Sequence, residues 1–293
     1  MSLRLARPLA LLALLAGAAS SMAAEVGWQR PFSDVAALSV RAPDRVIAYG
    51  PAASQFGELW LPPGREGAAP VVVLVHGGCW LAEYGIAHIR PLAASLAQAG
   101  FAIWALEYRR VGEAGGGWPG TFRDVAAGID HLAQLDEPRL DVSRVVLAGH
   151  SAGGHLALWA ASRDRLSPDS TLHMEPEIRP NGVLGLAAIT DLVAYASDDN
   201  SCARVTPRLL GGTPFERPER YEQASPAALG SRTNTILLQG EADAIVPPAQ
   251  AEALPGARVV LLPEAGHFDL IHPDTPAFER IRDLLEASLN DAP

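Results

Sequence analysis

The sequence predicts an α/β fold in which a mainly parallel central sheet is flanked by helices. Short apolar runs alternate along the chain with segments of helical periodicity, and this alternation requires crossover connections between parallel strands. The run at 71–75 is apolar throughout, without polar alternation, which is typical of a strand that is buried on both faces. The 293 residues are 48% hydrophobic, as in an ordinary globular protein.

The predicted elements follow one another in a regular order. Segments 46–49 and 58–61 are expected to form an antiparallel pair of short strands. Further strands are expected at 71–75, 101–106, 145–148, 183–189, 235–238 and 259–262. Helices are expected at 89–98 (ending at Gly100, a suitable C-terminal cap), 121–135, 152–161, 248–254 and 278–289. Residues 192–233 form the longest irregular stretch, and we interpret them as an insertion over the sheet rather than as a second domain.

The first 24 residues have the pattern of an export signal. Arg4 and Arg7 precede an uncharged stretch, rich in Leu and Ala, that ends in small residues before Glu25. This stretch has 17 residues, fewer than the roughly 20 that span a bilayer. We predict cleavage after Ala23, or alternatively after Ala24, which leaves a single domain over 24–293. The protein is then expected to be periplasmic or secreted without a stable membrane anchor, and an uncleaved anchor is the alternative.

The charged residues exclude several classes of function. Acidic residues outnumber basic ones by 33 to 23, for a net charge of −10, so a nucleic acid is not an expected partner. All 23 basic residues are arginine and the sequence has no lysine. Schiff-base chemistry, a Walker A lysine and a Ser–Lys dyad are therefore excluded.

The chain has two cysteines, Cys79 and Cys202. An oxidising compartment permits a disulfide between them. Two free buried thiols are the alternative, and the sequence alone is compatible with both.

A G-x-S-x-G pattern at 149–153 follows the strand expected at 145–148 and precedes a helix. Glycines permit the tight strand-to-helix turn that lifts the hydroxyl of Ser151 clear of the sheet edge. A hydroxyl needs a base, and the base needs an acid that orients it. In this architecture acid and base follow the serine in that order, and Asp243 and His267 each come just after a later predicted strand.

A second glycine-rich motif, His-Gly-Gly-Cys-Trp at 76–80, follows the buried strand at 71–75. Consecutive glycines let backbone N–H groups approach a developing negative oxygen. The N–H of Ala152, next to the proposed nucleophile, is expected to be a further donor.

With these motifs, the chain resembles the serine hydrolases of the α/β-hydrolase superfamily over about residues 40–290. It is similar to the esterase/lipase branch with an HGG motif, in which a Tyr-Arg…Pro…Asp stretch recurs, here Tyr108-Arg109, Pro119 and Asp124. The motif at 76–80 resembles the HGGxW motif of kynurenine formamidases. Esterases similar to hormone-sensitive lipase carry a third Gly where this chain has Cys79.

The resemblance implies an α/β-hydrolase fold with a small insertion over the site, and it implies specific site residues. Ser151 would be the nucleophile, Asp243 the acid and His267 the base. The oxyanion hole would consist of the N–H groups of Gly78, Cys79 and Ala152. A bridge from Cys79 to Cys202 would tie the oxyanion loop to the insertion.

Other residues compete for these roles. Asp191 and Glu241 are alternative acids, and His272 is an alternative base that lacks the Gly-His-Phe setting of His267. His76, His150 and His155 are interpreted as packing residues, because no metal-ligand spacing accompanies them; no metal or cofactor is expected. Aromatic residues on loops near the site could line a substrate pocket or belong to the core, namely Trp80, Tyr84, Trp118 and Phe268.

The predicted function is hydrolysis of small-molecule carboxylic esters through an acyl-enzyme. An amide or formamide hydrolase of the kynurenine formamidase type is the alternative. A non-catalytic binding module with the same fold is a third class, but such proteins typically lack a triad residue and this chain has all three. The sequence leaves acyl length and oligomeric state open.

Overall fold

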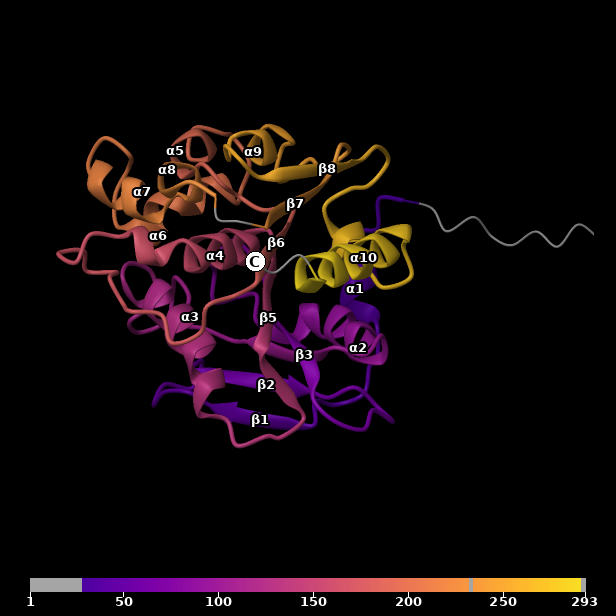
Figure 1. Cartoon of the computed structure of the whole chain (residues 1–293). Coiled ribbons are helices and arrows are strands. Elements are labelled where there is room, and N and C mark those ends of the chain that lie inside the picture. The colour runs from indigo at the N-terminus through magenta and orange to yellow at the C-terminus, as the bar shows by residue number, and fades with distance from the viewer. Residues whose placement is uncertain (1–27, 232–233, 291–293) are drawn as a thin grey trace, which may run out of the picture.

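The computed structural model describes residues 28–231 and 234–290, and over these residues the chain forms an eight-stranded sheet with helices on both faces (Figure 1). The strands lie in the order β1-β2-β4-β3-β5-β6-β7-β8. β2 is antiparallel to both of its neighbours, and the other neighbouring strands are parallel. The predicted mainly parallel α/β fold is therefore confirmed. The strands are β1 Arg45–Ala48, β2 Phe56–Trp60, β3 Ala69–Val75, β4 Ala102–Leu106, β5 Leu140–His150, β6 Gly182–Leu186, β7 Thr235–Gly240 and β8 Arg258–Leu262.

Helices cover the sheet in two layers. In Figure 1, α3 (Gly120–Asp130) and α4 (Ala152–Ala161) lie on one face, whereas α1 (Phe32–Ala37), α2 (Arg90–Gln98) and α10 (Pro276–Asn290) lie on the other. Each face corresponds to its own cluster of buried apolar side chains.

The remaining helices are short. They are α5 Leu192–Tyr195, α6 Thr206–Leu210, α7 Pro218–Ala224, α8 Pro226–Leu229 and α9 Ala249–Glu252, with 3₁₀ turns η1 Ile86–Ile89, η2 His131–Gln134, η3 Arg163–Arg165, η4 Ala203–Val205 and η5 Phe268–Ile271.

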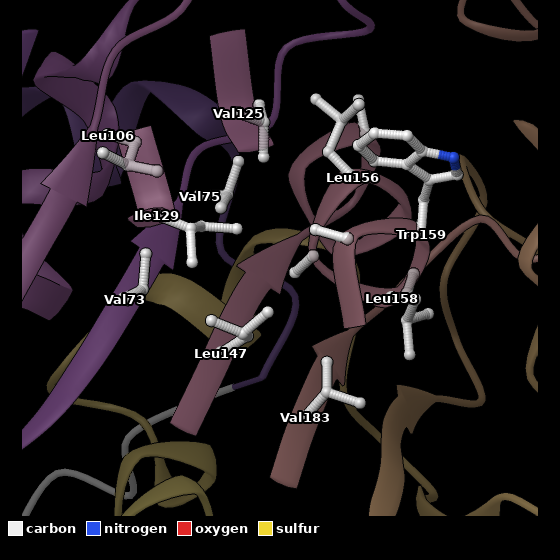
Figure 2. Close-up of a cluster of buried hydrophobic side chains, with 14 of the residues drawn as sticks. Val73, Val75, Leu106, Val125, Ile129, Leu147, Leu156, Leu158, Trp159 and Val183 are labelled. Atoms are coloured by element: carbon white, nitrogen blue, oxygen red, sulfur yellow. The ribbon is translucent and has the colours of Figure 1, made fainter. Parts of the chain in front are cut away.

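Strand β3 shows why the apolar run lacks polar alternation. Val71, Val73 and Val75 belong to the cluster beneath α3 and α4, and Val72 and Leu74 to the cluster on the opposite face. Successive side chains of a strand point to opposite faces, so a strand covered on both sides needs apolar residues at every position. Figure 2 shows part of the first cluster, in which Val73, Val75, Leu147 and Val183 of the strands pack near Val125, Ile129, Leu156, Leu158 and Trp159 of the helices.

The structure differs from the prediction at several boundaries. Helix α1 was not predicted, and the stretch at 192–233, predicted to be irregular, contains the short helices α5 to α8. The strand expected at 183–189 ends at Leu186, because Ala187 has a φ of +46° that takes the chain out of the sheet. The helix expected at 121–135 ends at Asp130 and continues as η2.

The predicted signal peptide at 1–23 lies outside the described residues. Among the residues that are described, no helix is both long and apolar enough to cross a membrane.

Candidate active site

Ser151 occupies the sharp turn between β5 and α4. Its backbone has φ 56° and ψ −120°, a conformation that is strained for a residue with a side chain. The glycines around it are required by close packing. A Cβ on Gly149 would collide with the carbonyl of Gly153, and a Cβ on Gly153 would collide with the carbonyls of Val75 and His76. The turn therefore forms only because both positions are glycine.

Asp243 and His267 meet on adjacent loops. Asp243 follows β7, His267 follows β8, and the Nδ1 of His267 lies 2.7 Å from an oxygen of the Asp243 carboxylate. The other carboxylate oxygen accepts hydrogen bonds from the backbone N–H groups of Ile245 (2.8 Å) and Val246 (2.9 Å). Because a carboxylate accepts hydrogen bonds, Nδ1 of the imidazole is the donor, and in the neutral imidazole Nε2 then presents a lone pair.

Ser151 and His267 line the same cavity, which has a volume of about 200 Å³. Within the described residues no hydrogen bond joins the Ser151 hydroxyl to the imidazole; such bonds are often long in structures without substrate and tighten when substrate binds. The residues that line the cavity are Phe32, Gly78, Cys79, Tyr84, His88, His150, Ser151, Ser201, Cys202, Ile245, His267 and Phe268.

The loop after β3 has a backbone suited to binding an anion. Gly78, Cys79 and Trp80 all have positive φ, at +97°, +52° and +57°. Gly78 and Cys79 donate no backbone hydrogen bond to any described residue, so their N–H groups are free to point at a ligand. Ala152 is the first residue of α4, where N–H groups have no partner within the helix. The N–H groups of Gly78, Cys79 and Ala152 are thus available to bind a negative oxygen, as predicted for an oxyanion hole.

A buried polar cluster supports this loop from below. His76 donates from Nε2 to the carboxylate of Glu107 (2.9 Å), and the hydroxyl of Tyr108 donates to the carbonyl of His76 (2.8 Å). Burial raises the pKa of Glu107, but the charges of His76 and Arg110 and the N–H of Ile86 outweigh it, and the pKa is lowered overall. Glu107 is therefore an anion that holds the start of the loop.

A disulfide joins Cys79 to Cys202 across 123 positions of sequence, with the two Cα atoms 5.0 Å apart. Of the two states compatible with the sequence, the structure therefore has the bridged one. Because Cys79 belongs to the loop after β3 and Cys202 precedes η4, the bridge ties this loop to the segment between β6 and β7.

The predicted aromatic lining is only partly at the cavity. Phe268 and Tyr84 line it, but Trp80 and Trp118 are not among its lining residues. Trp80 is fully buried in the core, and its Nε1 donates to Nδ1 of His155 (3.2 Å). Trp118 packs edge-on against Phe122 and lies under the guanidinium of Arg220, 5.5 Å from the ring centre.

The alternative acids and base lie away from the cavity. Asp191 caps α5 by accepting from the N–H groups of Val193 and Ala194. Glu241 is exposed, and Nδ1 of His272 accepts from the N–H of Asp274 (3.2 Å). None of the three side chains lines the cavity.

Three further histidines near the site, His88, His150 and His155, are neutral at physiological pH. Burial and the neighbouring His267 lower the pKa of His150 well below its usual range, and its Nε2 donates to the backbone carbonyl of His267 (3.0 Å). Burial also lowers the pKa of His155 to about 4 and, with the charge of His76, that of His88 to about 3. In the described part of the chain no group of three or more side chains is arranged to hold a metal ion.

Sequence reasoning missed several cavity residues, namely Phe32, His88, Ser201 and Ile245. None belongs to a motif. Phe32 and His88 lie on α1 and η1, and no local pattern indicates that these elements reach the site.

Curated relatives include esterases. The chain is 25% identical over 250 residues to esterase LipQ of Mycobacterium tuberculosis. This match covers 81% of this chain and 57% of LipQ. It is 26% identical over 277 residues to a probable isoprenylcysteine alpha-carbonyl methylesterase, ICMEL2, of Arabidopsis thaliana. This match covers 85% of this chain and 64% of the relative. The chain thus spans about three fifths of the length of these relatives.

Solved structures share the fold. A truncated carbohydrate esterase from gut microbiota superposes with a TM-score of 0.73 at 21% identity, over 86% of this chain and all of the other. Esterase B from Lactobacillus rhamnosis also gives 0.73 at 21% identity, over 88% of this chain and 89% of the other. The expected resemblance to the esterase/lipase branch of the α/β-hydrolases is confirmed. A family model, BD-FAE, matches residues 58–257, which is more than half of the chain, and the protein therefore belongs to the BD-FAE family.

Proposed function

We propose that this protein hydrolyses carboxylic esters of small molecules through an acyl-enzyme. The observation that carries the proposal is the hydrogen bond of 2.7 Å between His267 and Asp243 beside a cavity that Ser151 also lines. The esterase relatives support the same class of reaction.

Each proposed residue has one role. His267, oriented by Asp243, takes the proton of Ser151 through Nε2 as the oxygen attacks the ester carbonyl. The N–H groups of Gly78, Cys79 and Ala152 stabilise the negative oxygen of the tetrahedral intermediate. His267 then protonates the leaving alcohol, and water hydrolyses the acyl-enzyme with His267 again as the base.

The test compares two serines of the same cavity. Ser151→Ala is expected to lower kcat on p-nitrophenyl acetate by about 10⁴-fold or more and to abolish labelling by a fluorophosphonate, and Asp243→Asn is expected to lower kcat by a similar factor. Ser201→Ala is the matched control, because Ser201 lines the cavity but has no role in the proposed reaction. A folded Ser151→Ala protein with parental activity would refute the proposal. Turnover of N-formylkynurenine in place of the esters would favour the amide alternative.

We also propose that the protein is exported after removal of residues 1–23. The Cys79–Cys202 disulfide supports this, since such bonds persist in oxidising compartments. The mass of the protein recovered from the periplasm or medium is expected to correspond to a chain that begins at Ala24. A full-length chain in the cytoplasm would contradict the proposal.

A further inference from the structure

The N-terminal segment 28–37 is packed against the loop that carries His267. Its helix α1 lies on the same face of the sheet as α2 and α10 (Figure 1) and contacts η1 and η5. Val35 of α1 is 1% exposed and belongs to the same apolar cluster as Ile86 of η1 and Leu270 of η5. The segment is therefore an integral part of the fold beside the site.

A buried carboxylate joins this segment to the His267 loop. Asp269 has no exposed surface, and one of its oxygens accepts from the N–H groups of both Gln29 and Gly266, each at 2.6 Å. Its other oxygen accepts from the N–H of Arg30 at 3.1 Å. Hydrogen bonds to a charged acceptor are stronger than neutral ones. Because Gly266 directly precedes His267, Asp269 holds the N-terminal segment and the proposed base in one arrangement.

Phe32 is the residue of this segment that reaches the cavity. It lines the cavity together with Ser151 and His267. Its ring lies 5.4 Å from that of Phe268, 5.8 Å from that of His88 and 5.9 Å from that of Tyr84, measured between ring centres. Ring contacts with three neighbours from two other segments fix its position.

We propose that the N-terminal segment forms one wall of the active-site cavity and that Phe32 limits the length of the apolar chain that a substrate ester can carry on that side. This inference rests on the proposed ester hydrolysis. A cavity of about 200 Å³ leaves little space beyond the ester group, so removal of a fixed aromatic ring adds a substantial share of the available room. One methylene in an apolar pocket changes kcat/KM by roughly tenfold or more.

The experiment uses two variants of the full-length chain and two series of esters. Phe32→Ala opens the wall, and Phe32→Trp fills more of the cavity. The acyl series runs from p-nitrophenyl acetate to p-nitrophenyl octanoate, and the alcohol series from methyl acetate to hexyl acetate. With Phe32→Ala, the ratio of kcat/KM for the longest to the shortest ester is expected to rise about tenfold or more in at least one series. With Phe32→Trp the same ratio is expected to fall.

Phe215→Ala is the matched control, since Phe215 is 95% exposed between α6 and α7 and does not line the cavity. Circular dichroism and fluorophosphonate labelling confirm that each variant is folded and retains its nucleophile. Unchanged ratios in both series, in a folded and active Phe32→Ala protein, would overturn the inference and leave the proposed function standing. A parent protein inactive on every ester would instead refute the proposed function.

Discussion

Removing the Cys79–Cys202 disulfide is expected to lower both stability and activity. The appropriate perturbation is the double variant Cys79→Ser and Cys202→Ser, because a single substitution would leave a reactive thiol in the cavity that both cysteines line. The bridge closes a loop of 123 positions. In the chain-entropy model a closed loop of that length restricts the unfolded chain by about 16 cal/mol/K, or about 5 kcal/mol at 25 °C. Measured losses for native disulfides are about 2–5 kcal/mol.

The assay for stability is urea unfolding of the oxidised parent and of the double variant, followed by circular dichroism. We expect the free energy of unfolding to fall by about 2–5 kcal/mol. A difference below about 1 kcal/mol would show that the loop-closure reasoning fails for this chain. The parent after reduction provides a check, because it should approach the stability of the variant.

The effect on activity follows from the backbone beside the bridge. Cys79 and Trp80 hold left-handed conformations that cost of order 1 kcal/mol or more each, so they persist only where the surroundings enforce them. Without the bridge the loop can relax and withdraw a proposed oxyanion donor, whose loss costs about 10²-fold or more in kcat. We expect kcat to fall at least tenfold, with a smaller change in KM. An unchanged kcat would show that the polar cluster around Glu107 positions the loop without the bridge.

Two further predictions concern stability. His88, His150 and His155 have lowered pKa values, so they stay neutral in the folded protein but bind protons in the unfolded chain below about pH 6.5. The free energy of unfolding should therefore fall as the pH drops from about 6.5 toward 4. The expected loss is up to about 1.4 kcal/mol per pH unit for each histidine. Urea titrations at several pH values measure how steeply the free energy of unfolding depends on pH, and in His155→Gln this slope should correspond to about one proton fewer than in the parent. A slope identical to that of the parent would contradict the prediction. Gly153→Ala should prevent folding, because its Cβ would meet backbone carbonyls. At Gly100 a Cβ meets nothing within 4 Å, so Gly100→Ala should cost only about 1–2 kcal/mol of backbone strain. Thermal unfolding of both variants checks this.

Features set by local sequence were predictable. The strand at 71–75, the G-x-S-x-G turn and helix α4 at 152–161 each follow from apolar runs and glycines within a few residues. The contact of Asp243 with His267 was predictable because carboxyl ends of parallel strands meet at one edge of the sheet.

Features set by tertiary contacts were not predictable. Helix α1 has six residues and no side-chain cap at Pro31, so its sequence carries no helix signal; burial of Val35 against η1 and η5 stabilises it. Trp80 is the last residue of the motif at 76–80, but its positive φ belongs to a turn that leaves its ring fully buried. Sequence position near a motif therefore does not determine which side chains face the cavity.

The segment between β6 and β7 supplies Ser201 and Cys202 to the cavity but none of the proposed reacting groups. A mutant library aimed at altered substrate range is therefore best concentrated in the exposed positions that precede Cys202, at 197, 199 and 201. Cys202 itself has to stay constant in such a library, because it anchors the whole diversified region to the loop on which the chemistry depends.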